Sequence, residues 1–142
     1  MSGRIHDKIE EIEGYLGELE SMLPPSLKEY RVDLKAKAAC ERYFERIVEA
    51  FVDLAYLVIK DQGFRPPEED KKVFDVLSEN ALITPELAER LGDAKSMRNI
   101  LAHQYGAVND ELVYAALTKE LGADCRRFIQ EVRKSLKASK VH

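Results

Sequence analysis

The hydrophobic residues of the chain recur at helical spacing along almost its whole length. In residues 4–22 they return every three or four positions and form one apolar stripe on an otherwise charged segment, at Ile5, Ile9, Ile12, Leu16 and Leu19. Similar periodicity predicts further helices over residues 27–61, 68–79, 85–91, 94–104 and 110–137. No segment combines period-two alternation with enrichment in β-branched residues. We therefore predict an all-α fold, an up-and-down antiparallel helical bundle with four long helices and several short ones.

Prolines, glycines and capping residues predict where these helices begin and end. Pro24-Pro25 ends the first helix, because proline lacks an amide proton and disfavours helix in the residue before it. Ser26, with Glu29 three residues later, is typical of a capping box. Gly63 is suited to a left-handed C-cap. A single helix over 27–61 would span about 50 Å at about 1.5 Å per residue, so we expect a kink or a break near its start.

Length and charge limit the number of domains and the kinds of partner that are expected. The 142 residues are expected to form one domain, 1–142, and no run is long enough to span a bilayer. The N-terminus has no apolar signal core, so a cytoplasmic protein without a membrane partner is expected. The net charge of −4 argues against broad, non-specific coating of nucleic acid. The first helix is acidic and the last is basic; these two could face each other, or the basic end could meet a polyanion.

Residues that commonly hold metals or cofactors do not form a recognisable pattern. Cys40 and Cys125 both fall in apolar helical stretches, where buried reduced thiols are expected. The chain contains no HExxH sequence, EF-hand loop, Cys/His cluster or close pair of carboxylates. It also lacks a glycine-rich phosphate loop, which argues against an NTPase. We expect no metal and no cofactor.

The candidate catalytic side chains are concentrated in the segment Met97-Arg98-Asn99-Ile100-Leu101-Ala102-His103-Gln104-Tyr105-Gly106. Histidine can take a proton from a ribose 2′-hydroxyl or give one to a leaving oxygen near neutral pH. Arginine can hold a phosphate with two hydrogen bonds and stabilise developing charge. The pair therefore suits phosphodiester cleavage without a metal. Structural roles explain the same residues equally well: an ion pair for Arg98, a solvated ring for His103 and a half-buried aromatic for Tyr105.

Helix geometry constrains how this pair could act. Arg98 and His103 are five residues apart, which puts them about 140° apart around a regular helix. Three arrangements could bring them together: the helix ends or distorts near His103, the side chains reach round to a shared cleft, or a second copy of the chain completes the site. Gly106 predicts a helix end near Tyr105.

The Arg98-x4-His103-x-Tyr105 pattern resembles the Rx4HxY signature of HepT-like HEPN proteins, and the flanking segments 77–80, 83–88 and 109–114 agree with it. The resemblance covers nearly the whole chain. It implies a dimeric helical bundle of a HEPN/MNT toxin–antitoxin pair, with a catalytic cleft at the dimer interface. It further implies that Arg98 and His103 are catalytic, that Asn99 supports them, and that Tyr105 receives AMP groups from an MNT-type nucleotidyltransferase antitoxin.

These observations lead to one main hypothesis of function and two alternatives. The main one is a metal-independent endoribonuclease toxin, a homodimer acting on tRNA or mRNA and neutralised by AMPylation of Tyr105. The first alternative is a non-catalytic HEPN module that docks a nucleotidyltransferase partner or binds nucleotide. The second is a structural dimerisation protein, in which substitutions at the motif would have no effect.

Overall fold

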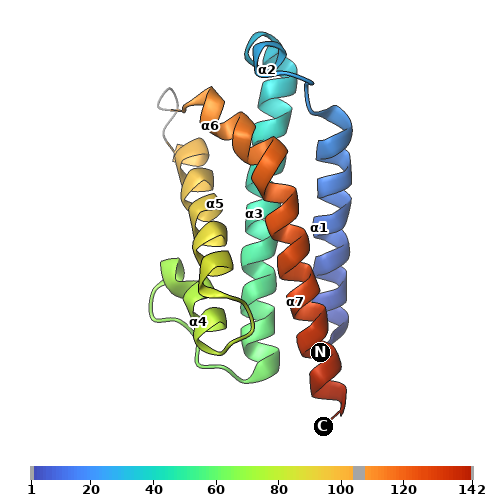
Figure 1. The fold of residues 1–142 in the computed structure, drawn as a ribbon, viewed down its shortest axis with the longest axis vertical. Helices are drawn as coiled ribbons and strands as arrows, with labels where there is room; N and C mark the ends of the chain where they lie inside the picture. The colour runs from blue at the N-terminus through green and yellow to red at the C-terminus, as the bar shows by residue number, and fades with distance from the viewer. Residues whose placement is uncertain (1, 104–107, 142) are drawn as a thin grey trace.

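The computed structural model of the protein describes residues 2–103 and 108–141. Four long helices dominate this part of the chain: α1 (Ser2–Met22), α3 (Leu34–Gln62), α5 (Pro85–His103) and α7 (Leu121–Val141). They run alternately up and down, side by side (Figure 1). The described residues form no strand. The all-α antiparallel bundle is therefore confirmed.

The predicted helix over residues 27–61 is wrong in one respect, because it is two helices. The short α2 (Leu27–Val32) is separated from α3 by Asp33, whose backbone leaves the helical region at φ −90° and ψ 90°. The amide of Asp33 donates to the carbonyl of Glu29, which closes α2. Its carboxylate accepts from the amide of Ala36 at 3.1 Å and caps α3. The expected break near the start is thus produced by one aspartate that belongs to both helices.

Two other capping predictions are confirmed. Ser26 Oγ accepts a hydrogen bond from the amide of Glu29 at 3.2 Å and caps α2. Gly63 adopts a left-handed conformation, φ 71° and ψ 25°, at the end of α3. Glycine takes this conformation without the steric cost that a side chain would add.

The predicted helices 85–91 and 94–104 are a single helix, α5, so the break expected at Gly92-Asp93 is wrong. A glycine inside a helix costs only about 1 kcal/mol. The buried side chains of Leu87, Leu91 and Leu101, on both sides of Gly92, hold the helix together. The prediction for 68–79 began too early: Glu69 is extended, Asp70–Lys72 form a 3₁₀ turn (η1), and α4 covers only Val73–Glu79. The turn begins at Asp70, whose carboxylate is tied to Lys95 and Tyr56 on neighbouring helices.

The predicted last helix, 110–137, is an uninterrupted helical segment, but part of it is π-helical rather than α-helical. It comprises α6 (Asp110–Ala115), a π-helical segment η2 (Ala116–Glu120) and α7, which extends to Val141. Such π segments are single-turn insertions in an α-helix. Gly122 follows the insertion and leaves room for a neighbouring ion pair, since a Cβ there would lie 2.9 Å from Arg126 Nη1.

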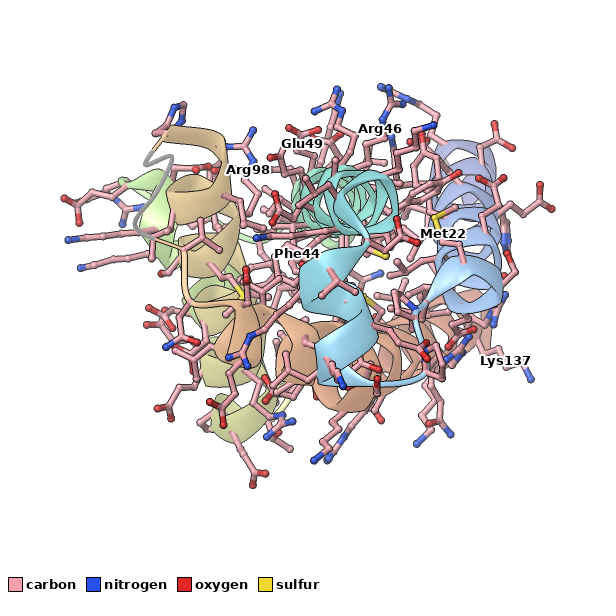
Figure 2. All side chains as sticks on the ribbon, turned by 90° about the horizontal axis from the view of Figure 1, so that it is seen from above. Met22, Phe44, Arg46, Glu49, Arg98 and Lys137 are labelled. Atoms are coloured by element: carbon pink, nitrogen blue, oxygen red, sulfur yellow. The ribbon has the colours of Figure 1, made fainter. Side chains whose placement is uncertain are left out.

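The core lies around α3, between α1, α5 and α7. Phe51, Phe74 and Phe128 stack edge to face in its centre, with ring centroids 5.6 and 6.1 Å apart. Seen from above, Phe44 of α3 points among the helices while Lys137 projects outward (Figure 2). Both cysteines are buried. No helix within the described ranges is long and apolar enough to cross a membrane.

The acidic first helix and the basic last helix face each other. Arg126 donates to both carboxylate oxygens of Glu20, at 2.7 and 2.9 Å, and Arg133 donates to Glu13 at 3.3 Å. Of the two alternatives for this charge asymmetry, mutual pairing is therefore realised at these positions.

Candidate functional site

The described part of the motif, residues 97–103, lies on the second half of α5, a helix whose start is well determined. Thr84 Oγ1 accepts from the amide of Leu87 at 3.1 Å and caps the helix, and Pro85 occupies its first position. Lys95, Arg98 and Asn99 all line one cleft between α5 and α3. The helix thus presents three polar groups of neighbouring turns to the same space.

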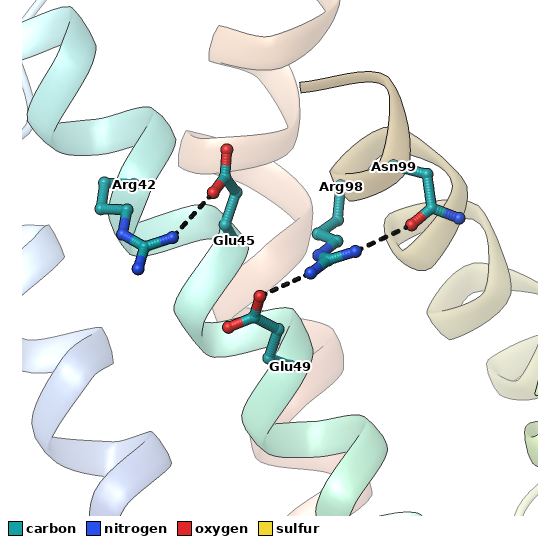
Figure 3. A network of polar contacts seen from close by, with 5 residues as sticks. All are labelled: Arg42, Glu45, Glu49, Arg98 and Asn99. Carbon is teal, nitrogen blue, oxygen red and sulfur yellow. Dashed lines mark hydrogen bonds and ion pairs between the residues drawn. The ribbon is translucent and has the colours of Figure 1, made fainter. Parts of the chain in front are cut away.

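Arg98 is held from two directions (Figure 3). Its Nη2 donates to Glu49 Oε1 of α3 at 2.6 Å, and its Nη1 donates to Asn99 Oδ1 at 3.1 Å. The Arg98 side chain is 28% exposed and that of Glu49 is 43% exposed. Arg98 Nε is buried and makes no hydrogen bond to any described residue. The guanidinium is therefore oriented at the wall of the cleft by its two terminal nitrogens, while its buried Nε has no hydrogen-bond partner among the described residues.

The cleft has a volume of about 250 Å³. Its described lining consists of Val48, Glu49, Val52, Asp53, Asp70, Lys95, Arg98 and Asn99. Three carboxylates and two cations thus face one another in this lining. An anionic ligand that enters the cleft must replace the carboxylates as the partners of the cations.

Asp70 also lines the cleft, where its carboxylate has two partners. Lys95 Nζ lies 2.6 Å from Asp70 Oδ2, and the Tyr56 hydroxyl donates to Asp70 Oδ1 at 2.6 Å. The hydrogen bonds from Lys95 and Tyr56 lower the pKa of Asp70. Burial and the bond to Asp70 raise the pKa of the Tyr56 phenol to about 12. Tyr56 therefore stays protonated and acts as a donor at physiological pH.

His103 does not join Arg98 in this cleft. It is the last described residue of α5, it is exposed, and it is not among the cleft's lining residues. The helix remains α-helical through His103, so distortion before the histidine does not bring the pair together. Distortion between Arg98 and His103 is therefore excluded, whereas a helix end near His103, a long reach within one chain and completion by a second copy remain. Tyr105, and the helix end expected near it, lie outside the described residues.

The structure brings Arg98 and Asn99 together and adds four residues that sequence reasoning missed: Glu49, Tyr56, Asp70 and Lys95. Lys95 could have been found, because it precedes Arg98 by three residues and so shares its side of the helix. Glu49 is 49 residues from Arg98, and nothing local in the sequence relates the two.

The described side chains place a guanidinium, a group suited to binding phosphate, at the wall of the cleft and an imidazole at the end of the same helix. Within residues 2–103 and 108–138, no group of three or more histidine, cysteine or acidic side chains is arranged to hold a metal ion.

The sequence of this chain is similar to those of known proteins. A family model described as Ribonuclease HepT-like matches residues 12–132. A candidate RNase of Archaeoglobus fulgidus is 36% identical over 60% of this chain and 63% of its own length. The tRNA nuclease HepT of Aphanizomenon flos-aquae is 25% identical over 80% of this chain and 78% of its own length. The mRNA nuclease HepT of Shewanella oneidensis is 29% identical over 63% of this chain and 66% of its own length. The chain thus spans less than two thirds of the Archaeoglobus fulgidus relative.

Solved structures share the fold. A tri-AMPylated Shewanella oneidensis HEPN toxin in complex with an MNT antitoxin superposes with a TM-score of 0.84 at 24% identity, over 92% of this chain and 96% of that one. A toxin–antitoxin complex with AMP-PNP gives a TM-score of 0.84 at 23% identity, over 92% and 97% of the two chains.

Proposed function

Because the chain belongs to the HepT-like ribonuclease family, we propose that it is a metal-independent endoribonuclease that cleaves tRNA or mRNA. The observation that carries this proposal is the Arg98 guanidinium, oriented by Glu49 and Asn99 at the wall of an open cleft. An arginine whose two terminal nitrogens are held by neighbouring side chains is prepared to bind a phosphate in a fixed geometry. Relatives that are named as tRNA and mRNA nucleases support the substrate class.

The proposed reaction is transfer of the phosphoryl group to the neighbouring 2′-oxygen of the RNA. The 2′-oxygen forms a bond to phosphorus, the bond from phosphorus to the 5′-oxygen breaks, and the leaving 5′-oxygen takes up a proton. His103 accepts the proton of the 2′-hydroxyl or donates the proton to the leaving oxygen. Arg98 binds the phosphate and stabilises its increasing negative charge, with Asn99 supporting the guanidinium.

We propose that the active site is completed by a second copy of the chain. Arg98 and His103 are about 140° apart around α5, which is regular up to His103. A two-fold dimer would place the arginine of one protomer beside the histidine of its partner and form two equivalent sites.

The proposed control of this activity is modification of Tyr105. The Shewanella oneidensis HEPN toxin that shares the fold is AMPylated and bound to an MNT antitoxin. Tyr105 follows His103 by two residues. An AMP group there would add bulk and negative charge beside a site that binds phosphate, so it would repel the substrate. The proposed partner is an MNT-type nucleotidyltransferase acting as antitoxin.

The decisive experiment is RNA cleavage by the purified protein in EDTA. We expect His103→Ala and Arg98→Ala to lower cleavage about 100-fold or more, the usual effect of losing an acid–base group or a phosphate-stabilising cation. His6→Ala and Arg4→Ala, at exposed positions of α1, are matched controls and should cleave like the parent. Circular dichroism checks that each variant is folded. Full activity of the His103→Ala protein would refute the proposed mechanism.

A non-catalytic HEPN module is the second candidate, favoured by one observation. Both cations in the described lining of the cleft are paired with carboxylates, as expected for residues that serve packing. Incubation with the nucleotidyltransferase and ATP, followed by mass spectrometry, separates the candidates. AMP on Tyr105 together with loss of RNA cleavage supports the toxin. A tight complex without cleavage under any condition supports the module.

A further inference from the structure

In the cleft that contains Arg98, the lining carboxylate of Asp70 accepts from a second group of hydrogen-bond donors. Lys95 Nζ and the Tyr56 hydroxyl converge on one carboxylate, that of Asp70, and each contacts a different oxygen at 2.6 Å. The donors come from α5 and α3, and the carboxylate comes from the short η1 turn. Two donors from two long helices thus enclose a single anionic group.

Exposure separates the donors from the anion. The Lys95 side chain is 14% exposed, whereas that of Asp70 is 63% exposed. The cation is therefore recessed in the wall of the cleft and the carboxylate approaches it from the solvent side. An anion from solution could take the same approach if the Asp70 side chain turned away.

The chemistry of the two donors fits a phosphodiester. A phosphodiester carries one negative charge and two non-bridging oxygens, as a carboxylate has one charge and two oxygens. The raised pKa of Tyr56, caused by burial and by the bond to Asp70, keeps its hydroxyl a donor. Lys95 precedes Arg98 by three residues and lines the same cleft, so a nucleic-acid strand held by Arg98 would pass Lys95.

We propose that Lys95 and Tyr56 form a phosphate subsite for the RNA backbone next to the phosphate bound by Arg98, and that Asp70 occupies this subsite in the free protein. The RNA part rests on the proposed function. Asp70 is then a competitor of RNA, and binding of RNA exchanges one anionic partner of Lys95 for another.

The test measures binding of a fluorescently labelled single-stranded RNA of about 20 nucleotides in EDTA, with His103→Ala in every protein to prevent cleavage. Lys95→Gln should weaken binding about fourfold at 0.15 M salt and lower the slope of log K against log salt by about 0.7, the contribution of one phosphate on a single strand. Asp70→Asn should strengthen binding by a similar factor, because it removes the competing charge. Tyr56→Phe should weaken binding less than Lys95→Gln, because it removes a neutral donor.

Lys72→Gln is the matched control. Lys72 lies on the same turn as Asp70, is exposed, and is 3.9 Å from its partner Glu69. It should leave both the affinity and the salt slope unchanged. Thermal unfolding of each variant shows whether the bundle is intact.

The opposite signs expected for Lys95→Gln and Asp70→Asn, together with no effect of Lys72→Gln, which removes the same charge nearby, distinguish a ligand site from a structural ion pair and from a general charge effect. A purely structural pair would make both variants change RNA affinity in the same direction or not at all, and either result would overturn the subsite. Cleavage by the parent protein is measured separately. If the parent cleaves RNA but Lys95→Gln leaves RNA affinity unchanged, the subsite alone is refuted. If Lys95→Gln and Asp70→Asn shift RNA affinity in opposite directions but the parent never cleaves RNA, the ribonuclease activity alone is refuted.

Discussion

Glu49 controls the orientation of Arg98. Their 2.6 Å ion pair, together with the bond to Asn99, fixes two of the guanidinium nitrogens in the cleft wall. An arginine held in this way loses less side-chain entropy when it binds a phosphate. Glu49 also adds a negative charge to a cleft that is proposed to bind RNA, so its two effects oppose each other.

We therefore expect Glu49→Gln to lower kcat about tenfold while leaving the KM for RNA equal or lower. Tenfold corresponds to about 1.4 kcal/mol, close to the lower limit of about 1.5 kcal/mol for hydrogen bonds to charged groups. Steady-state cleavage of a short RNA measures both constants. Glu45→Gln, one turn earlier on α3 and paired with Arg42, is the control and should change neither. A raised KM with unchanged kcat would show that Glu49 does not position Arg98.

Glu41 is a residue whose charge is costly to the folded state. Burial raises its pKa, Lys37 opposes this, and Asp110 and Glu45 raise it further. Because the pKa is higher in the folded state than in the unfolded chain, ionisation of Glu41 destabilises the fold at neutral pH. This penalty disappears as the pH falls from the folded pKa toward the unfolded value of about 4.3.

Glu41→Gln should therefore raise the Tm at pH 7, and the difference from the parent should vanish near pH 4. Thermal unfolding followed by circular dichroism between pH 4 and 8 measures this. Glu10→Gln, on the exposed face of α1, provides the comparison. A Glu41→Gln protein that is less stable than the parent at pH 7 would contradict the expected sign.

At the scale of the elements, one aspartate divides what periodicity predicts as a single helix. Asp33 ends α2 through its backbone amide and starts α3 through its carboxylate. The apolar pattern continues across the break, so the pattern alone does not reveal it. At Gly92 the opposite holds, because buried leucines on both sides keep α5 continuous through a residue that favours a break.

Asp33→Ala should cost about 1 kcal/mol of unfolding free energy, the usual effect of losing an N-cap. Asp33→Asn keeps a capping oxygen and should lower the unfolding free energy by only a few tenths of a kcal/mol. Urea denaturation measures the unfolding free energy of both variants, and an unchanged m-value shows that the difference is one of stability. Equal stability of the Ala and Asn variants would mean that the carboxylate contributes nothing to the break.

At the scale of the whole molecule, we propose that the site is completed by a second chain. One protomer places Arg98 in a cleft and His103 on an exposed position at the end of the same helix, about 140° away. In the proposed symmetric dimer, each site would combine an arginine from one chain with a histidine from the other.

Mixing inactive Arg98→Ala and His103→Ala proteins, with unfolding and refolding to exchange subunits, should restore about a quarter of the parental cleavage. Half of the reassorted dimers contain both variants, and each of these has one intact site out of two. The separate variants, refolded alone, are the controls. A mixture as inactive as its components would show that Arg98 and His103 act within one chain.

Features that depend on neighbours along the chain can be predicted from the sequence. Apolar spacing, capping residues and Gly63 are sufficient for the all-α bundle and for most helix ends, because helix hydrogen bonds join residues four apart. The spacing of Arg98 and His103 likewise showed that one regular helix does not align them. The tertiary structure alone decided the partners of the site: Glu49 for Arg98, and Asp70 with Tyr56 for Lys95. Such pairs depend on the rotation and axial position of α5 and η1 against α3, which are set by the packing of the shared core and leave no periodic trace in the sequence.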